Sequence, residues 1–209
     1  GMADRLRKIL ALPPARSDNA GRVARILAFA RGHFGTAEGG RRLLDVGAGI
    51  GVFPAAMKAA GWQVTGVEPD PRTAEHLRRE IGIEALSDDL LNLAPGHVGR
   101  FDVVTFNKVL EHVEDPVALL AHARGLMAPG GFCYVELPDV AAAAEGAWRE
   151  EFFIEHHHVF SPASLAMLAA RAGFSPAVVE RLREPSGKYT VFSFMSADGM
   201  IPERECPGQ

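Results

Sequence analysis

Cysteine is scarce in this sequence, which contains only two residues of that type, Cys133 and Cys206. The two are far apart and lack the paired spacing of metal-binding cysteines, so the sequence indicates neither a disulfide framework nor a zinc site. Cys133 lies within the apolar run Gly-Phe-Cys-Tyr-Val, and we expect it to be a small buried residue of the core.

The sequence also lacks a strong excess of one charge and any long apolar run. The 22 Lys and Arg residues against 26 Asp and Glu give a net charge of −4, which provides no general attraction to nucleic acid. No stretch approaches the roughly 18 apolar residues that cross a membrane, and no signal-peptide pattern opens the chain. We therefore expect a cytoplasmic protein without a membrane span and without nucleic acid as a partner.

The sequence does contain a regular alternation of short apolar runs and helical segments. Its 209 residues, 47% of them hydrophobic, suit one domain with a sizeable core. Strand–helix alternation predicts an α/β fold with a mainly parallel sheet and helices on both of its faces. The expected strands are 42–46, 63–67, 83–86, 101–106, 132–137, 177–183 and 189–195, and the expected helices are 19–34, 51–60, 71–81, 116–127 and 162–172.

Ligands of such sheets bind at the carboxyl ends of the strands, so the residues after each strand are candidates for a site. The first strand leads into Gly47, Gly49 and Gly51, a G-x-G-x-G turn that allows close approach of a ligand. A dinucleotide-binding turn would have Gly or Ala at position 52, where this chain has Val. The preceding acid, Asp45, suits a cationic amino acid better than a pyrophosphate. A tight turn without a ligand is the alternative.

Acids also follow the second and third strands. Glu68 could accept both hydrogen bonds of a ribose diol. It is not needed to cap the next helix, because Asp70 can do so, and it is therefore available to bind a ligand. Either Asp88 or Asp89 could reach the exocyclic amine of an adenine, and a role as a turn residue is an equally good interpretation.

Five segments, taken in order, carry a resemblance to a known family. They are LLDVGAGIGVF (43–53), GVEPD (66–70), FDVVTFNKVLEHVEDP (101–116), LMAPGGFCYVELP (126–138) and HHHVFSPASLAMLAARAGF (156–174). Together they resemble class I S-adenosylmethionine (SAM)-dependent methyltransferases, in the group related to ubiquinone-biosynthesis and polysaccharide-cluster methyltransferases. The resemblance implies a Rossmann-like seven-stranded sheet with an antiparallel last strand.

The resemblance also implies a division of the chain. Residues 2–40 would form an N-terminal helical segment that covers the cofactor site. Residues 41–197 would form the SAM-binding domain, with a substrate-side insertion at 138–160, and residues 198–209 would form a flexible tail.

Site residues follow from the resemblance position by position. The turn that includes Gly47, Ala48, Gly49 and Gly51 would wrap the methionine part of SAM, with Asp45 close to its amino group. Glu68 would hold the ribose hydroxyls. The remaining cofactor residues are Pro69, Asp88, Asp89 and Leu90 around the adenine, and Asn107 and Lys108 along the methionine and adenosine.

Two histidine segments are candidates on the substrate side. The pair Glu111-His112 is common in the family and could approach the transferred methyl, but a role at a helix start is equally good. The run 155–158 falls where the family places substrate recognition, and histidine is a common general base. We expect His156 or His158 to be catalytic. Adjacent histidines rarely all point at one ion, so we predict no metal site.

The function that the sequence predicts is methyl transfer from SAM to a small-molecule acceptor, a hydroxylated or sugar-like metabolite. An inactive SAM-binding protein, an NAD-dependent oxidoreductase and a domain that has kept the fold without a ligand are the alternatives. The sequence identifies neither the acceptor nor the oligomeric state.

Overall fold

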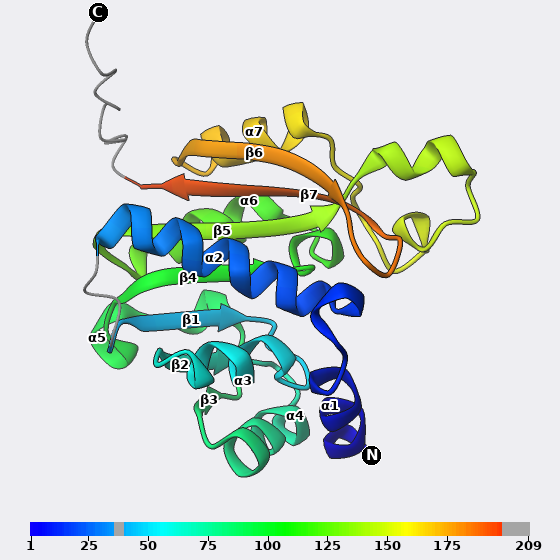
Figure 1. The fold of residues 1–209 in the computed structure, drawn as a ribbon. Coiled ribbons are helices and arrows are strands. Elements are labelled where there is room, and N and C mark those ends of the chain that lie inside the picture. Colours follow the sequence, from blue (N-terminus) through cyan, green and yellow to red (C-terminus); the bar gives the residue numbers. More distant parts are fainter. Residues whose placement is uncertain (36–39, 198–209) are drawn as a thin grey trace, which may run out of the picture.

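Seven strands form one twisted sheet in the order β3-β2-β1-β4-β5-β7-β6 (Figure 1). The computed structural model describes residues 1–35 and 40–197, so the tail predicted at 198–209 lies outside the described residues. All pairs among the first five strands are parallel, and β7 runs antiparallel to both β5 and β6, which confirms the predicted fold class. The strands are β1 Arg42–Val46, β2 Gln63–Val67, β3 Glu84–Leu86, β4 Phe101–Asn107, β5 Met127–Pro138, β6 Ser175–Arg183 and β7 Tyr189–Ser196.

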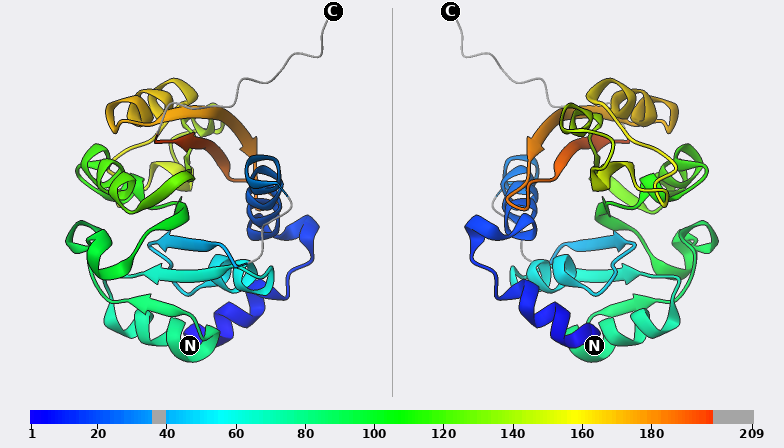
Figure 2. Two further views of the ribbon diagram at one scale, coloured as in Figure 1. Left: turned by 90° about the vertical axis from the view of Figure 1, so that its left-hand side faces the viewer. Right: turned by 90° about the vertical axis from the view of Figure 1, so that its right-hand side faces the viewer.

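Helices cover both faces of this sheet, as the end-on views of Figure 2 show. One face carries α2 (Asp18–Phe34), α3 (Val52–Ala59) and α4 (Pro71–His76), and the other carries α6 (Pro116–Gly125) and α7 (Pro162–Arg171). Apart from a π turn described below, the remaining helices are α1 Met2–Leu10, α5 Pro95–Val98, η1 Pro14–Arg16, η3 Leu90–Asn92, η4 Leu110–His112, η5 Val140–Glu145 and η6 Glu150–Phe152.

Side-chain caps fix where the main helices begin. The hydroxyl of Ser17 accepts a hydrogen bond from the amide of Ala20 at the start of α2. Asp70 and Asp115 cap α4 and α6 in the same way, and Ser161 caps α7. A proline follows each of these caps at the first helical position. The caps of α4, α6 and α7 lie at the predicted helix starts, and α2 begins at Asp18, one residue before its predicted start.

The predicted helix 71–81 has its predicted bounds but is not α-helical throughout. The α-helix ends at His76 and continues as a wider π turn over Leu77–Ile81, which Gly82 ends at a φ of 69°. The ammonium group of Lys58 donates to the carbonyls of Ile81 and Gly82, so these carbonyls at the end of the helix have a hydrogen-bond partner. Leu77 remains fully buried in the widened turn.

Strand β5 and helix α6 also differ from their predicted bounds. The helix ends at Gly125 and the strand begins at Met127, because Met127 already pairs with Phe101 of β4. The pair Gly130-Gly131 therefore lies within the strand and not before it.

Two apolar clusters, one on each face of the sheet, form the core. Adjacent residues of one strand point to opposite faces, so Leu43 belongs to the cluster under α2 and α3 while Leu44 belongs to the cluster under α6. Both are fully buried. The chain leaves β1 toward β2 and β3 and then returns to β4, so the strand order reverses between β1 and β4. Their carboxyl ends are where this topology creates a ligand crevice.

Residues 138–160, predicted as a substrate-side insertion, lie beyond the carboxyl end of β5 (Figure 1). They contain η5 and η6, and a bridge between Asp139 and Phe160 brings the two ends of the segment together. Trp148, Phe153 and Ile154 are exposed on it. Among the described residues, no helix combines the length and the apolar character that a membrane span requires.

Candidate active site

The turn between β1 and α3 requires glycine at its first and last positions. Gly47 and Gly51 have φ angles of 67° and 83°. A Cβ atom on Gly47 would lie 2.7 Å from Cγ2 of Val109, and one on Gly51 would overlap Cδ1 of Ile81. The turn therefore packs closely against the segment after β4 and against the π turn, while its other face borders the crevice.

A buried acid lies beside this turn. Asp45 is 2% exposed, and its Oδ1 accepts hydrogen bonds from the Thr105 hydroxyl at 2.7 Å and the Asn107 amide at 2.8 Å. Burial raises the pKa of Asp45 to about 7, although these two hydrogen bonds oppose the shift. The Oδ1 atom of Asn107 is buried without a partner. A donor group with positive charge would satisfy both side chains.

Glu68, at the end of β2, is tied to the same turn. One of its carboxylate oxygens accepts a hydrogen bond from the backbone amide of Gly49 at 2.9 Å. The side chain therefore links the carboxyl ends of β1 and β2 and still has a second oxygen available for a ligand.

A cleft, here named the cofactor cleft, runs from this turn along the ends of β2 and β3. Asp88 and Asp89 border it and also have local partners, since Asp88 accepts from the Asn92 amide and Asp89 caps η3. Both interpretations of these acids, as turn residues and as ligand contacts, are therefore compatible with their positions. The cleft brings together five predicted cofactor residues, Gly47, Pro69, Asp88, Asp89 and Leu90, and is also lined by Val46, Val67, Leu91, Val109, Val113, Glu114, Asp115, Ala118 and Leu119.

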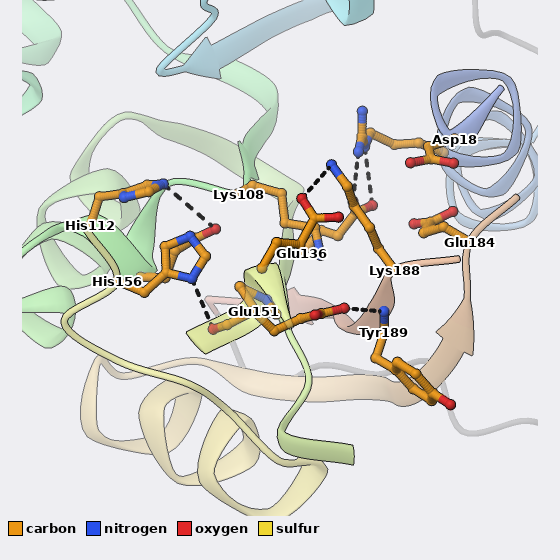
Figure 3. A pocket seen from close by; sticks show the side chains of 13 residues that line it. Asp18, Lys108, His112, Glu136, Glu151, His156, Glu184, Lys188 and Tyr189 are labelled. Atoms are coloured by element: carbon orange, nitrogen blue, oxygen red, sulfur yellow. Dashed lines mark hydrogen bonds and ion pairs between the residues drawn. The ribbon is translucent and has the colours of Figure 1, made fainter. Parts of the chain in front are cut away.

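A second cavity, here named the His156 pocket, lies at the carboxyl ends of β4 and β5 (Figure 3). His112 and His156 stand on one side of it, and Asp18 and Glu184 on the other. Lys108 lines this pocket and not the cofactor cleft, and its ammonium group donates to the Thr190 hydroxyl at 2.7 Å. Across residues 1–35 and 40–197, it is the only non-glycine residue with a positive φ, 60°.

A buried ion pair forms one wall of the His156 pocket. The Arg22 guanidinium of α2 binds both carboxylate oxygens of Glu136, at 2.6 and 3.0 Å, and Arg25 adds a contact of 3.1 Å. The Tyr134 hydroxyl donates to the same carboxylate. Burial alone would raise the pKa of Glu136, but the charge and hydrogen bonds of Arg22 lower it to about 2. Sequence reasoning missed Arg22 and Glu136; the available signal was one acid inside the apolar run 132–137.

The two predicted catalytic histidines lie in different surroundings. His156 lines the His156 pocket, and its Nδ1 is 2.9 Å from the carbonyl of Glu151. His158 borders a separate surface hollow beside α6 and α7, with its Nε2 3.1 Å from the carbonyl of Val113. His112 joins His156 in the pocket, and Glu111, 1% exposed, lies against both.

Comparison with known sequences points to one family. A family profile described as a methyltransferase domain matches residues 15–179. The ubiquinone biosynthesis O-methyltransferase of Bordetella avium is 30% identical over 155 residues, which cover 66% of this chain and 63% of that protein. The protein of the same name from Psychrobacter arcticus is 38% identical over 101 residues, 45% of this chain and 39% of that protein. The chain thus spans less than two thirds of the length of these relatives.

Solved structures show the same fold at lower sequence identity. The magnesium protoporphyrin IX methyltransferase of Synechocystis, crystallised with bound SAH, has a TM-score of 0.69 at 16% identity, with 92% of each chain covered. A 1,6-didemethyltoxoflavin-N1-methyltransferase of Burkholderia thailandensis has a TM-score of 0.62 at 21% identity, with 83% of this chain and 76% of that chain covered. Since the family profile covers most of the chain, this protein belongs to the methyltransferase-domain family, as its resemblance to class I SAM-dependent methyltransferases predicts.

Proposed function

We propose that this protein binds SAM in the cofactor cleft and transfers its methyl group to a small hydroxylated molecule in the His156 pocket. The observation that carries the proposal is that two consecutive residues, Val109 and Lys108, line the cleft and the pocket respectively. The two spaces therefore share one wall at the end of β4. Two ligands held there would meet without a large movement of the chain.

The residues around the cleft suit SAM chemically. The Asp45 carboxylate and the unpartnered Oδ1 of Asn107 would accept hydrogen bonds from the cationic amino group. Glu68 would hold the ribose hydroxyls with its free oxygen, and Asp88 the adenine amine. Bound SAM supplies an activated sulfonium methyl, so the chain itself has to orient the acceptor and exclude water.

An acceptor hydroxyl must lose its proton during transfer, and His156 is placed to take it. The carbonyl of Glu151 can only accept a hydrogen bond, so Nδ1 of His156 carries the hydrogen and Nε2 keeps its lone pair. By the same reasoning Nε2 of His158 donates to Val113, and its role in catalysis stays a prediction. A hydroxylated acceptor agrees with the O-methyltransferase activity named for the relatives.

Alanine substitutions separate the two histidines. We expect His156→Ala to lower turnover by roughly 10²–10⁴-fold, the usual contribution of a positioned acid or base, and His158→Ala to have a smaller effect. The measurement is S-adenosylhomocysteine formation with a panel of phenols and sugars as acceptors. Unchanged turnover in the double variant would refute a role for either histidine.

Calorimetric titration with SAM, and separately with NAD, tests the cofactor. We expect saturable SAM binding that Glu68→Ala weakens by roughly ten- to a hundredfold, because a charge-assisted hydrogen bond contributes about 1.5–3 kcal/mol. The buffer should be at pH 8, above the pKa of about 7 that burial gives Asp45, so that this carboxylate is ionised toward the ligand.

The matched control for that titration is Glu75→Ala, which removes an exposed glutamate of α4 outside the cleft. It should bind SAM like the parent protein. Tight NAD binding without SAM binding would favour the oxidoreductase, and binding of neither ligand by folded protein would favour a domain that has kept only the fold.

A further inference from the structure

Three side chains from two separate segments converge in the His156 pocket. Glu111 and His112 belong to η4, which follows β4, and His156 follows η6 in the insertion. One potential ligand atom from each lies within 4.8 Å of the others. Nε2 of His112 is 3.9 Å from a carboxylate oxygen of Glu111, and the two imidazole rings are 4.8 Å apart between centroids.

Backbone carbonyls orient both rings in the same way. Nδ1 of His112 lies 3.1 Å from the carbonyl of Glu155, and Nδ1 of His156 lies 2.9 Å from that of Glu151. Because a carbonyl only accepts, each Nδ1 carries a hydrogen, and in the neutral ring each Nε2 presents a lone pair. A histidine that binds a metal through one nitrogen commonly donates its other N–H to a carbonyl in this manner.

The carboxylate of Glu111 and the Nε2 atoms of His112 and His156 form a group of hydrogen-bond acceptors without a donor among them. Glu111 is 1% exposed, and its Oε2 is buried without a hydrogen-bond partner. A carboxylate and two imidazole lone pairs repel one another unless a proton or a cation lies between them. The backbone holds this arrangement, because the carbonyl of Glu111 accepts from the amides of His157 and His158 at 2.7 and 3.3 Å.

The surrounding wall adds negative charge. Lys108 and Arg22 face the pocket as cations, together with Lys188. Against these three stand six carboxylates, those of Asp18, Glu111, Glu136, Glu150, Glu151 and Glu184. Several of these charges are already paired. Glu136 pairs with Arg22, Glu151 with Arg149, Glu150 with Lys188 and Glu184 with Arg25. Asp18 and Glu111 then remain, with Lys108 as the remaining cation. The pocket therefore favours an occupant with positive charge.

We propose that Glu111, His112 and His156 bind a divalent metal ion of the class that imidazole favours, with Zn²⁺ as its representative. Two histidines and one glutamate are a ligand set of catalytic zinc sites, which keep a fourth position open for water or substrate. Tetrahedral ligands with bonds of about 2.0–2.1 Å lie roughly 3.3 Å apart, so side chains that lie within 4.8 Å of one another must close in by up to about 1.5 Å. His112, whose side chain is 45% exposed, has room to do so.

This inference replaces one step of the proposed function, the role of His156 as proton acceptor, and only its chemical consequence rests on that function. A hydroxylated acceptor that occupies the open position would have a lowered pKa at its hydroxyl, as metal-bound water does. The O–H proton would leave to water. The new O–CH₃ bond would form as the S–CH₃ bond breaks, with the bonding electrons staying on sulfur. His156 would then serve as a ligand and not as the proton acceptor.

Metal binding can be measured without any acceptor. Protein stripped with a chelator is titrated with Co²⁺, which takes the same ligands as Zn²⁺ and absorbs visible light when bound, and Zn²⁺ is then used to displace it. We expect one equivalent of Co²⁺ to bind. Affinity should fall at least tenfold in Glu111→Gln, His112→Ala and His156→Ala, since losing even an outer partner of a metal site costs about 10–100-fold.

His157→Ala is the matched control, because His157 is the exposed neighbour of His156 and is absent from the ligand cluster. It should bind Co²⁺ like the parent. The inference is overturned if folded protein shows no saturable binding, or if the three variants bind as tightly as His157→Ala. Titrating the same samples with SAM separates the two proposals. SAM binding without metal binding removes only the metal site, and metal binding without SAM binding removes only the proposed cofactor.

Discussion

Replacing Glu136 with glutamine is expected to lower the free energy of unfolding by about 3–5 kcal/mol, the cost of removing one partner of a buried ion pair. The side chain of Glu136 is fully buried, and that of Arg22 is 14% exposed. Glutamine keeps the shape and some hydrogen bonds but leaves the guanidinium group of Arg22 without a balancing charge. Urea unfolding of both proteins at pH 7 measures the difference.

The pH dependence of this difference has a defined sign. The pKa of Glu136 falls from 4.5 to about 2 on folding, so its carboxylate contributes fully above about pH 4.5 and loses that contribution as pH falls toward 2. The gap between the two proteins should therefore narrow over that window. A gap that stays constant from pH 7 to pH 3 would mean that the charge of Glu136 does not stabilise the fold.

Glu184→Gln is the matched control, since Glu184 is also buried and lies 3.7 Å from Arg25. Burial raises the pKa of Glu184 from 4.5 to about 7. The folded state therefore binds the extra proton, and ionising Glu184 costs stability as pH rises through this range. We expect this variant to be neutral or more stable at pH 8, in contrast to Glu136→Gln.

Gly51→Ala is expected to destabilise the protein by about 2–5 kcal/mol. A left-handed backbone costs a non-glycine residue about 1–2 kcal/mol, and overpacking adds about 1–3 kcal/mol. Besides its overlap with Ile81, the new Cβ would lie 2.6 Å from Cδ2 of Leu77, which is fully buried and cannot move aside. Thermal and urea unfolding, without ligand, measure the loss.

A second glycine separates the two contributions. Gly61 also has a positive φ, 91°, but a Cβ there would meet nothing within 4 Å. Gly61→Ala should therefore show the backbone cost alone, about 1–2 kcal/mol. Adding Ile81→Ala to Gly51→Ala should recover part of the loss from overpacking. Equal losses in the two glycine variants would refute close packing at Gly51.

Local sequence signals were sufficient for most of the sheet. The strand 42–46 was predicted at its observed bounds because a short apolar run ends in a glycine turn. Asp70 marked a helix start through its ability to accept a hydrogen bond from the first free amides. The π turn after His76 was missed, because local periodicity does not separate an α turn from a π turn.

The residues of the candidate site also fall into two groups, those that local sequence signals place and those that only the fold brings together. The sequence placed Asp45, the glycine turn and Glu68 at the carboxyl ends of β1 and β2, because the topology fixes those ends. Their roles toward SAM stay predictions. The group formed by Glu111, His112 and His156 could not be predicted, because His112 lies 44 positions from His156 and only the fold brings them together. The prediction of no metal site considered only the histidines at 156–158, and the titration with Co²⁺ decides between it and the proposed site.

The pairing of Arg22 with Glu136 joins positions 114 residues apart, and this separation has a consequence for synthesis. Ribosomes add about 5–20 residues per second, so α2 is made on the order of ten seconds before its carboxylate partner exists. During that time the apolar side of α2, with Ile26 and Ala30, has no finished sheet to cover it. A nascent chain that ends before β5 therefore lacks both the partner of Arg22 and part of the apolar surface that covers α2 in the finished fold.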